Sequence, residues 1–520
     1  MAGRMAEIET IGDVLRQSAQ RVPDRVAVIE GEARLTYRGL DRAADRFANA
    51  LLAHGLGSGS TVAILSPNRA DYPAFYFGAA RAGCLQAHLS TRYTVGEIRE
   101  VSLRTGIDAV FADAELLQPL LQARADLPDL KTVVCFDATD ADGVIELGDF
   151  LADAAETPPE VAIDPDAPFC LTYTGGTTGF PKGVMVTQRA RVISTKIAWE
   201  PFQLREEDVL YLGTPLFHVA GLFSWFSTAM YGGCTIVLTR EWDPAALVRI
   251  AEREAVSVLC MVPTQISGFV SEPSLDPARL PAFRYINYGG SPMPEALLRR
   301  ILELFPDLTL MEHYGQSEIG PVCYRPPEQA LAKWASVGHP FDALTLEIRD
   351  SDERVLPQGE VGEVTVKSDW VFSAYYNDPE QTAEVLTADG WLRTGDLGFV
   401  DAEGYLFLVD RSKDMIISGG ENIYPAEIEN ALYDHAAIAE AAVFGVPDDE
   451  WGELPAAHVV LKPGASLSAD ELVAFLETKI ARHKRPRVVE FVDALPKTAI
   501  GKIRKNVIRA PYWEGRERAI

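Results

Sequence analysis

The chain has 520 residues, of which 47% are hydrophobic and 24% charged, and its formal net charge is −27 at neutral pH. This length exceeds what one hydrophobic core usually supports, so we expect at least two domains. The negative charge argues against nucleic acids and anionic membrane surfaces as partners. It also means that any phosphate site depends on lysine and arginine side chains gathered locally.

Six cysteines are scattered among apolar residues without a C-x-x-C pair, which predicts buried free thiols and a cytoplasmic protein. The first eleven residues contain no apolar signal core, and the last five form neither a prenylation box nor a peroxisomal tripeptide. Residues 219–238 are uncharged and have about the length of a membrane helix, but Gly232 and Gly233 interrupt them. We therefore expect a buried helix, a turn and a buried strand there, and no integral membrane segment.

Apolar strands alternate with amphipathic helices along the first part of the chain. Helical spacing covers residues 11–21 and the segment after Thr36, whose hydroxyl could cap that helix. Short apolar strands are expected at residues 26–29 and 62–65. This alternation predicts an α/β domain with mainly parallel sheets.

Residues 171–184 read LTYTGGTTGFPKGV, in which an apolar strand leads into hydroxyls and glycines and ends near Lys182. Glycines allow positive φ, and successive backbone N–H groups can form a concave anion site beside a lysine. The pattern indicates a polyphosphate-binding loop, although Pro181 and Gly183 distinguish it from the common G-x-x-x-x-G-K-[ST] loop. The alternative is a flexible turn between strands. The predicted phosphate contacts are Thr174, Gly175, Gly176, Thr177, Thr178, Gly179 and Lys182.

Two further segments follow predicted strands, where ligands bind in α/β sheets. His218 lies in the segment PLFHVAG after a strand at residues 209–212, and either faces a cleft or is an ordinary structural imidazole. Gly289 and Gly290 follow a strand and could admit a flat base, or simply form a strand-to-helix turn.

Two carboxylates occur in segments of low charge. Glu318 follows Tyr314 in the segment EHYGQSE and could hold Mg²⁺ beside phosphate oxygens; the alternative is a surface glutamate. Tyr314 could stack on a base. Asp396 lies between glycines and could accept hydrogen bonds from ribose hydroxyls, or be an ordinary turn residue.

The strands become shorter after residue 344, which predicts a small antiparallel β subdomain. The polar residues 410–414 are typical of a linker, and a compact α+β domain is expected after them. We therefore predict one domain over residues 1–410 and a second over residues 411–520. Lys502, on a glycine-bounded loop of the second domain, could reach a distant site, although most such lysines are ordinary surface residues.

Taken in order, these motifs resemble the adenylate-forming superfamily, which includes acyl-CoA synthetases, adenylation domains and beetle luciferases. Its loop pattern is close to YTSGTTGxPKG, and the resemblance extends from about Glu7 to Lys505. Gly175 stands where the family usually has serine, which removes one hydroxyl from the loop, and Ser317 replaces threonine in the YGxTE motif. The resemblance implies a large N-terminal domain of βα subdomains with a small antiparallel β subdomain, and a small mobile α+β C-terminal domain.

The resemblance also implies roles for individual residues. Lys502, Glu318 and Lys182 would be catalytic, with Glu318 binding the metal and Lys413 forming the hinge. Nucleotide contacts outside the phosphate loop would be Gly289, Gly290, Ser291, His313, Tyr314, Gly315, Gln316, Ser317, Asp396, Arg411 and Lys502. The acyl pocket would contain Phe217, His218, Phe223, Trp225, Tyr288, Gly289 and Gly290. The coenzyme A tunnel would contain Ser418, Gly419, Gly420 and Trp451.

The expected activity is that of an acyl-CoA synthetase using ATP, Mg²⁺ and coenzyme A, through an acyl-AMP intermediate. The predicted pocket is mostly apolar and contributes no additional arginine or lysine, so we expect a hydrophobic monocarboxylic acid, with a medium- or long-chain fatty acid leading. The alternatives are an aryl or cinnamate-type acid such as coumarate, ferulate or benzoate, or transfer of the acyl group to a carrier protein. A non-catalytic nucleotide sensor and a luciferase-like oxygenase are further alternatives, and a homodimer is compatible with the sequence.

Overall fold

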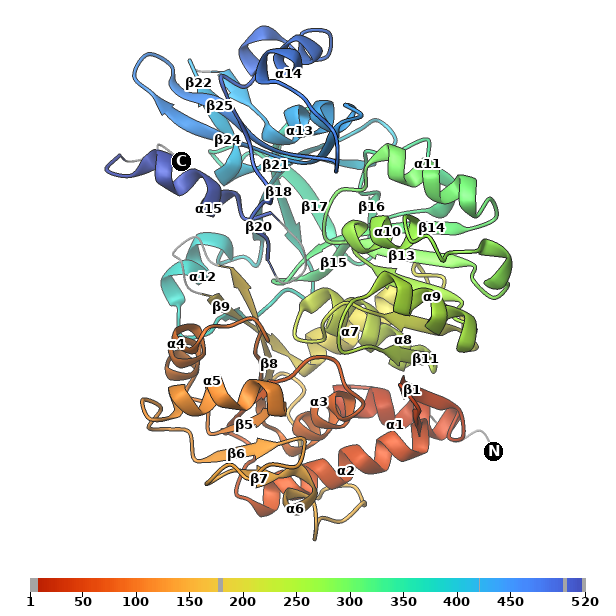
Figure 1. Ribbon diagram of the computed structural model, residues 1–520. Helices are drawn as coiled ribbons and strands as arrows, with labels where there is room; N and C mark the ends of the chain where they lie inside the picture. Colours follow the sequence, from red (N-terminus) through yellow and green to blue (C-terminus); the bar gives the residue numbers. More distant parts are fainter. Residues whose placement is uncertain (1–7, 176–180, 420, 499–502, 517–520) are drawn as a thin grey trace.

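The computed structural model describes residues 8–175, 181–419, 421–498 and 503–516. In Figure 1 the chain runs from the N-terminal part at the bottom, through the middle, to the C-terminal part at the top. Two large mixed sheets form the N-terminal and middle parts, and the largest hydrophobic core lies between them, with two further clusters under the helices of residues 244–304 and under those of residues 95–124. The predicted α/β class is confirmed.

The first large sheet has eight strands in the order β19-β9-β8-β4-β3-β5-β6-β7, and it is parallel from β8 to β7. At its other edge, β9 pairs antiparallel with both β8 and β19. The strands are β3 (Thr61–Leu65), β4 (Leu85–His88), β5 (Ala109–Ala112), β6 (Thr132–Cys135), β7 (Ile145–Glu146), β8 (Pro168–Gly175), β9 (Pro181–Thr187) and β19 (Ala374–Tyr375).

The second large sheet has nine strands in the order β16-β15-β14-β13-β12-β10-β11-β1-β2, and its six central strands are parallel. The strands are β1 (Val26–Glu30), β2 (Ala33–Thr36), β10 (Val209–Leu212), β11 (Thr235–Leu238), β12 (Val258–Met261), β13 (Tyr285–Gly289), β14 (Thr309–Gln316), β15 (Gly320–Arg325) and β16 (His339–Pro340).

Helices cover these sheets and begin where the sequence supplies caps: the Thr36 hydroxyl accepts from the Gly39 amide at the start of α2, as predicted. The helices of this part are α1 (Ile11–Arg21), α2 (Tyr37–Ala53), α3 (Asp71–Ala82), α4 (Val95–Thr105), α5 (Ala114–Arg124), α6 (Leu147–Phe150), α7 (Gln188–Trp199), α8 (Ser227–Gly232), α9 (Pro244–Arg253), α10 (Pro263–Val270) and α11 (Glu295–Leu304).

The uncharged residues 219–238 form a π-helix, η1 (Ala220–Phe226), followed directly by α8 and then by β11. Gly233 ends α8 in the left-handed conformation with φ +79°, and the surrounding side chains are buried in the core. The predicted helix, turn and strand are confirmed. In the described part of the chain, no helix combines the length and the apolar character needed to cross a bilayer. All six cysteines are buried free thiols, as predicted.

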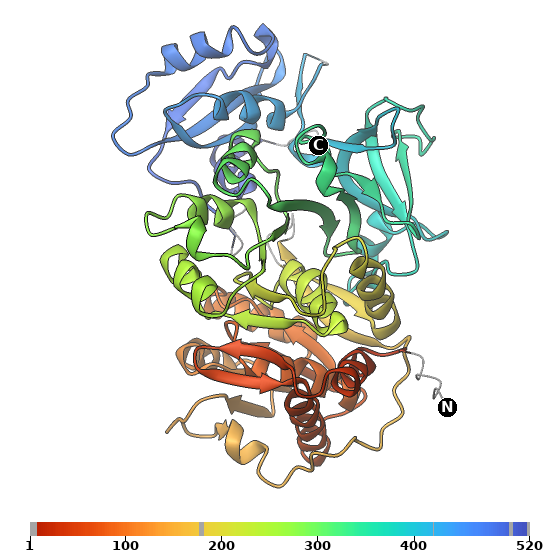
Figure 2. The same cartoon turned by 90° about the vertical axis from the view of Figure 1, so that its right-hand side faces the viewer.

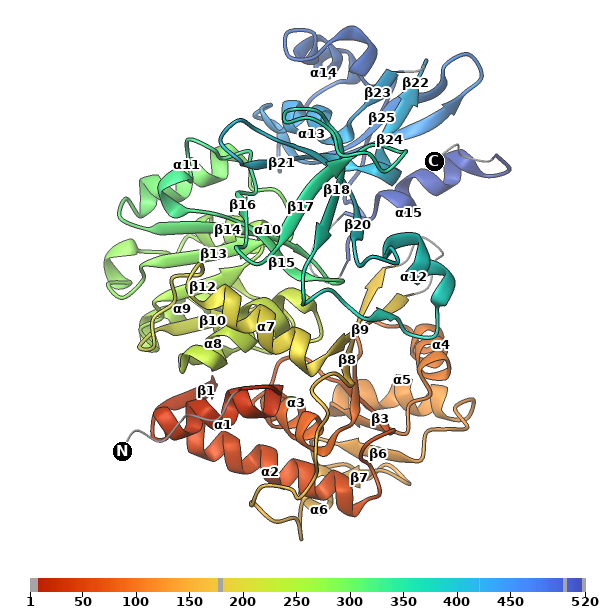
Figure 3. The same cartoon turned by 180° about the vertical axis from the view of Figure 1, so that it is seen from behind.

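Figures 2 and 3 show a four-stranded antiparallel sheet beside the middle part, with the C-terminal part next to it. The four-stranded sheet contains β17 (Thr345–Arg349), β18 (Gly362–Lys367), β20 (Leu392–Val400) and β21 (Leu406–Arg411), and α12 (Pro379–Val385) packs near β19 and β20. The C-terminal part contains β22 (Ile416–Ser418), β23 (Glu421–Ile423), β24 (Ile438–Asp448), β25 (Gly452–Leu461), β26 (Val488–Phe491), α13 (Pro425–Tyr433), α14 (Ala469–Leu476) and α15 (Lys505–Arg509). The short helix η4 (Ser412–Asp414) joins the two, close to the predicted boundary after residue 410.

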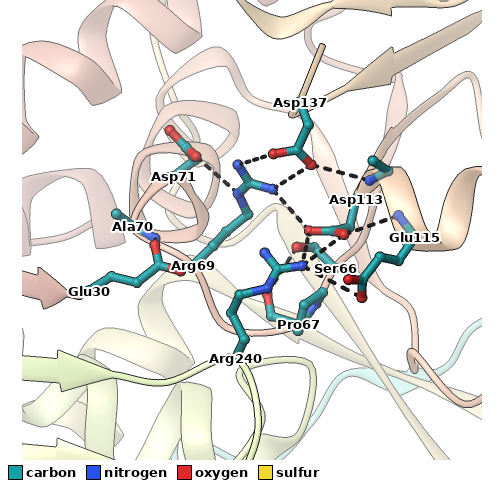
Figure 4. A network of polar contacts seen from close by, with 11 residues as sticks. Glu30, Ser66, Pro67, Arg69, Ala70, Asp71, Asp113, Glu115, Asp137 and Arg240 are labelled. Atoms are coloured by element: carbon teal, nitrogen blue, oxygen red, sulfur yellow. Dashed lines mark hydrogen bonds and ion pairs between the residues drawn. The ribbon is translucent and has the colours of Figure 1, made fainter. Parts of the chain in front are cut away.

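An ionic cluster around the buried Arg69 and Asp113, the Arg69 network, connects the two large sheets (Figure 4). Arg69, between β3 and α3, contacts Asp71 and Asp113 at 3.0 Å and Asp137 at 3.2 Å. Arg240, after β11, contacts the same Asp113 at 2.9 Å. Asp113 follows β5, so this carboxylate joins elements of both sheets through two arginines. The network holds the relative position of the sheets whose edges carry the predicted site.

Candidate active site

The carboxyl ends of β10, β12, β13 and β14 meet at one edge of the nine-stranded sheet because these strands are parallel. The segments containing His218, Gly289–Gly290 and Tyr314–Gln316 follow or end these strands, so they gather at this edge. Ligands in α/β sheets bind outside such edges. The topology therefore brings together three segments that the sequence predicted separately.

Asp396 is the centre of a polar cluster between β14, β20 and β21. Its Oδ2 atom accepts hydrogen bonds from the Tyr314 hydroxyl and from the Gln316 amide, both at 2.5 Å. The Arg411 guanidinium lies 3.2 Å from its Oδ1 atom. Burial and the Asp396 carboxylate raise the pKa of Tyr314 well above its ordinary value, so Tyr314 is a neutral donor. The Asp396 carboxylate in turn raises the pKa of Arg411.

Two neighbouring pockets share Tyr375 in their walls. The first, of about 260 Å³, also contains Glu318, Thr394 and Gly395, and the second, of about 220 Å³, contains Lys182. The Tyr375 hydroxyl donates to Glu318 Oε1 at 2.7 Å, and Lys182 Nζ lies 4.8 Å from the centre of the Tyr375 ring. This tyrosine, which the sequence analysis missed, therefore lies between the predicted metal ligand and the predicted phosphate lysine.

The phosphate loop is only partly described. Thr174 pairs with Lys182, and Gly175 with Pro181, across the antiparallel strands β8 and β9. Gly176, Thr177, Thr178 and Gly179 lie outside the described residues.

A buried aromatic group packs against β13 and β14. Phe217, Phe223 and Trp225 are each at most 8% exposed. The Trp225 indole donates to Asn287 Oδ1 at 3.1 Å, and His313 Nδ1 lies 2.9 Å from the same oxygen. Burial lowers the pKa of His313 to about 4, so its imidazole is neutral at physiological pH.

The glycine positions reflect close backbone approaches. A Cβ atom at Gly289 would lie 2.4 Å from the His313 carbonyl oxygen, and one at Gly315 would lie 2.1 Å from the Gly320 carbonyl oxygen. Gly290 has φ +85° and is exposed beside the half-buried Ser291, while Ser317 is half-buried in the turn between β14 and β15. These positions fix the backbone of the predicted nucleotide contacts.

Tyr288 does not join this aromatic group. Neighbouring residues of a strand point to opposite faces, and Tyr288 packs in a different hydrophobic cluster from the Trp225 cluster. Its hydroxyl instead contacts Arg325, which forms an ion pair with Glu312 at 2.7 Å. The structure therefore separates Tyr288 from Phe223 and Trp225, two of the other predicted acyl-pocket residues.

Arg191 is a second residue that the sequence analysis missed. It lies on α7, is fully buried, and places its guanidinium 4.0 Å from the centre of the Phe223 ring. Its nitrogen atoms have no hydrogen-bond partner among the described residues. The buried residues Arg191, Ser194, Thr195 and Ala198 recur at helical spacing, a pattern that indicates an arginine on the inner face.

The predicted residues of the C-terminal part are close together where they are described. Gly419 has φ +59° and its amide donates to the Trp451 carbonyl oxygen at 2.8 Å, while Ser418 pairs with Gly452. Half of the Trp451 side chain is exposed. Gly420 lies outside the described residues. Lys413 lies in η4, and its carbonyl oxygen accepts from Arg509 of α15 at 3.0 Å.

Lys502 lies outside the described residues, but its sequence neighbours touch the N-terminal part. The Thr498 carbonyl oxygen accepts a hydrogen bond at 3.2 Å from Arg92, which precedes α4. Lys497 and Ile503 form an antiparallel bridge. The described chain on the N-terminal side of Lys502 therefore contacts the N-terminal part.

The described residues contain no group of three or more His, Cys, Asp and Glu side chains that could hold a metal ion. Three glutamates, Glu318, Glu363 and Glu384, line the pocket that contains Tyr375, and Glu363 is paired with Arg393. Mg²⁺ is typically bound by one or two carboxylates when phosphate groups and water supply the other oxygens. The donor set therefore fits Mg²⁺ only together with a bound polyphosphate.

Comparison with known proteins identifies the family. The model of the AMP-binding enzyme family matches residues 15–376, and that of the AMP-binding enzyme C-terminal domain matches residues 427–502. The indoleacetate–CoA ligase of Aromatoleum aromaticum is 36% identical over 489 residues, which cover 94% of this chain and 95% of the relative. The long-chain-fatty-acid–CoA ligase of Mycobacterium tuberculosis is 35% identical over 511 residues, covering 97% and 99%.

The fold is also that of solved ligases. The crystal structure of the anthranilate CoA ligase AuaEII in complex with anthranoyl-AMP matches with a TM-score of 0.90 and 25% identity, over 97% of each chain. The two family matches together cover most of the chain, in the order in which the sequence motifs occur. This chain therefore belongs to the AMP-binding enzyme family, which confirms the resemblance to the adenylate-forming superfamily.

Proposed function

We propose that this AMP-forming acyl-CoA ligase activates a mainly apolar monocarboxylic acid as its acyl-AMP and then transfers the acyl group to coenzyme A. The observation that carries the proposal is the cluster of Tyr314, Gln316, Asp396 and Arg411, because it joins three separate sequence motifs beside the Glu318 pocket. Such a cluster can hold a nucleoside while the neighbouring pockets take its phosphates.

The cluster leaves room for a ribose. A carboxylate has about four acceptor sites, and Tyr314 and Gln316 both bind Oδ2 of Asp396. Arg411 faces Oδ1, which retains capacity for a ribose hydroxyl. We assign Asp396 as the ribose acceptor, Tyr314 as a contact of the adenine, and Arg411 as a positive charge near the phosphates.

The second pocket supports a polyphosphate role for Lys182, whose ammonium group lies beside Tyr375. Thr174, its partner across β8 and β9, would add a hydroxyl donor. Glu318 would hold Mg²⁺, which when bound would offset the charge of the phosphates. The protein needs no nucleophile of its own: it orients the carboxylate of the acid in line with the α-phosphate and neutralises the developing charge.

We assign Lys502 to the adenylation step, as its place in the sequence motif predicts. The hydrogen bond from Arg92 to Thr498 supports an orientation in which this segment of the C-terminal part lies against the N-terminal part. The thioester step would use Ser418, Gly419 and Trp451 after the C-terminal part rotates about Lys413.

The acid is expected to be mainly apolar. The buried Phe217, Phe223 and Trp225 favour an apolar acid, and the relatives compared above act on indoleacetate and on long-chain fatty acids. A medium- or long-chain fatty acid remains our leading expectation, with an aromatic acid as the second candidate. One methylene in an apolar pocket changes kcat/KM by about 10- to 200-fold, so a substrate series discriminates between them.

The decisive experiment measures both half-reactions. With ATP, Mg²⁺, coenzyme A and acids from butyrate to stearate, together with benzoate, ferulate and indoleacetate, the enzyme should release AMP and pyrophosphate. Lys502→Ala should abolish adenylate formation yet retain thioester formation from supplied acyl-AMP, whereas Lys479→Ala, which removes an exposed ion pair with Asp434, should leave both unchanged. Release of ADP and phosphate would exclude the mechanism, and acyl transfer to a carrier protein but not to coenzyme A would exclude the proposed acceptor.

A further inference from the structure

Arg191 is a buried cation for which the described protein supplies no acceptor. It is fully buried, and its Nε, Nη1 and Nη2 atoms have no hydrogen-bond partner within the described ranges. Its observed contact is the ring of Phe223, whose centre lies 4.0 Å from the guanidinium carbon. A guanidinium has five N–H donors, and a cation–π contact satisfies none of them as an acceptor atom would.

The surroundings do not neutralise this charge. Burial lowers the pKa of Arg191 to about 10, so the side chain stays protonated at neutral pH. Tyr76 and Cys170 are the ionisable groups that interact with it electrostatically, and burial raises the pKa of each, so both are uncharged. A buried charge without an acceptor is strongly unfavourable, which favours an acceptor that is not among the described residues.

The position of Arg191 indicates where such an acceptor would come from. Phe223 lies in the π-helix η1, five residues after His218. Gly320, two residues after Glu318, lies on another side: a Cβ atom there would be 3.3 Å and 3.4 Å from Nη1 and Nη2. Arg191 therefore lies between the two segments that carry the predicted acyl and metal residues, and π-helical turns occur frequently at functional sites.

We propose that Arg191 determines acid specificity by binding an oxygen acceptor at the end of the acid that is distal to the reacting carboxylate. This inference rests on the proposed function, since it assumes that the acid lies along η1. The acceptor is a ketone oxygen or a second carboxylate, because both present oxygen lone pairs to a guanidinium; a second carboxylate would replace the monocarboxylic acid proposed above by a dicarboxylic one. The sequence analysis expected no arginine in this pocket, and Arg191 is the residue that revises this expectation.

The test compares acids that differ only at the distal end. Octanoate, 7-oxooctanoate and octanedioate form one series; 3-phenylpropanoate and its para-acetyl and para-carboxy derivatives form a second. For the wild-type enzyme, at least one acceptor-bearing acid should exceed its unsubstituted parent by about 100-fold or more in kcat/KM for pyrophosphate release, because a buried polar group discriminates strongly against ligands that leave it unpaired. The ketone and carboxylate arms distinguish a neutral acceptor from an anionic one.

Arg191→Met removes the charge and retains an unbranched side chain of similar length. It should abolish the preference for the acceptor-bearing acid while leaving kcat/KM for the unsubstituted parent unchanged or higher. Arg189→Met is the matched control on the same helix, since Arg189 is partly exposed and pairs with Asp166 at 2.7 Å; it should change neither value.

Three results would overturn the inference. In the first, the wild-type enzyme shows no preference for either acceptor. In the second, Arg191→Met leaves an existing preference intact. In the third, Arg191→Met lowers kcat/KM equally for every acid, as expected of a structural residue solvated by buried water. Adenylation of plain acids without any distal preference would refute only this inference. Absence of adenylation with every acid would refute the proposed function as well.

Discussion

Two buried arginines of this protein lie in opposite environments. In the Arg69 network, the Arg69 side chain is 10% exposed and contacts the three carboxylates of Asp71, Asp113 and Asp137. Arg191 is completely buried against Phe223 and has no such partner in the described chain. The same type of side chain is therefore structural where the fold supplies acceptors, and available for a ligand where it does not.

The difference follows from where each residue lies in the topology. Arg69 is at the carboxyl end of β3, where the loops after β5 and β11 bring their polar residues together (Figure 4). Arg191 is in the first turns of α7, which packs against η1 and β15 in an apolar core. Four substitutions test this comparison.

Arg69→Met should cause the largest loss of stability. Asp113 is 1% exposed at its side chain and would be left with Arg240 as its cation. Breaking a buried ion pair on one side typically costs about 3–5 kcal/mol of unfolding free energy. Urea unfolding of the purified protein measures this cost. Arg99→Met, which removes an exposed pair with Asp126, is the control and should cost less than about 1 kcal/mol.

Arg191→Met should not lower the unfolding free energy, and it could raise it, in contrast to Arg69→Met. Replacing even a buried ion pair by apolar side chains of similar volume is often neutral, or stabilising by about 1–4 kcal/mol, and a buried charge without an acceptor has less stabilisation to lose. The same urea experiment, without substrates, should therefore show unchanged or higher stability. A loss comparable to that of Arg69→Met would mean that the free protein already satisfies Arg191, and the contrast between the two arginines would disappear.

Asp396→Asn tests the polar cluster around Asp396. The groups of this cluster are hydrogen-bonded to one another, as in the Arg69 network, but the cluster also borders a pocket that a ligand can enter. The substitution keeps the shape but removes the charge that faces Arg411. Charge-assisted hydrogen bonds contribute about 1.5–3 kcal/mol, so the KM for ATP should rise by roughly 10- to 100-fold. Steady-state kinetics with ATP varied measures the effect. Asp389→Asn, in an exposed turn bonded to Thr387, should leave the KM unchanged, and an unchanged KM in Asp396→Asn would refute the ribose assignment.

Arg92→Ala should have the smallest effect, because this arginine is exposed and its side chain makes one described hydrogen bond, to Thr498. Losing an exposed hydrogen bond of about 0.5–1.5 kcal/mol should slow adenylate formation by roughly 2- to 10-fold. Rapid-quench measurement of acyl-AMP should show this decrease, while thioester formation from supplied acyl-AMP stays at the wild-type rate. An equal decrease in both half-reactions would show that Arg92 does not favour one orientation of the C-terminal part.

Much of the fold could be predicted from local patterns. The alternation of strands and helices, the Thr36 cap and the helix, turn and strand of residues 219–238 all follow from side-chain periodicity and from glycine positions. The burial of all six cysteines follows from their apolar neighbours. The order of the motifs predicted the family, because each motif is short and its meaning depends on the segments around it.

Other features depended on tertiary structure. The sequence places Tyr288 next to Gly289, but only the packing of β13 decides which face Tyr288 occupies, and that face is turned away from Trp225. The pairing of Tyr375 with Glu318 joins residues 57 positions apart, and no local pattern specifies it.

What the sequence by itself determined was the set of elements, the family and the order of the site segments, because periodicity and motif spacing are local properties of the chain. What only the tertiary structure decided was which side chains meet: Asp396 with Tyr314 and Arg411, and Arg191 with Phe223. The physical reason is that the free energy of a charged side chain depends on the groups that the fold places around it. An arginine carries one unit of charge wherever it lies in the sequence, but the packing around it decides whether that charge has acceptors. In the described chain Arg69 has three carboxylates and Arg191 has no acceptor.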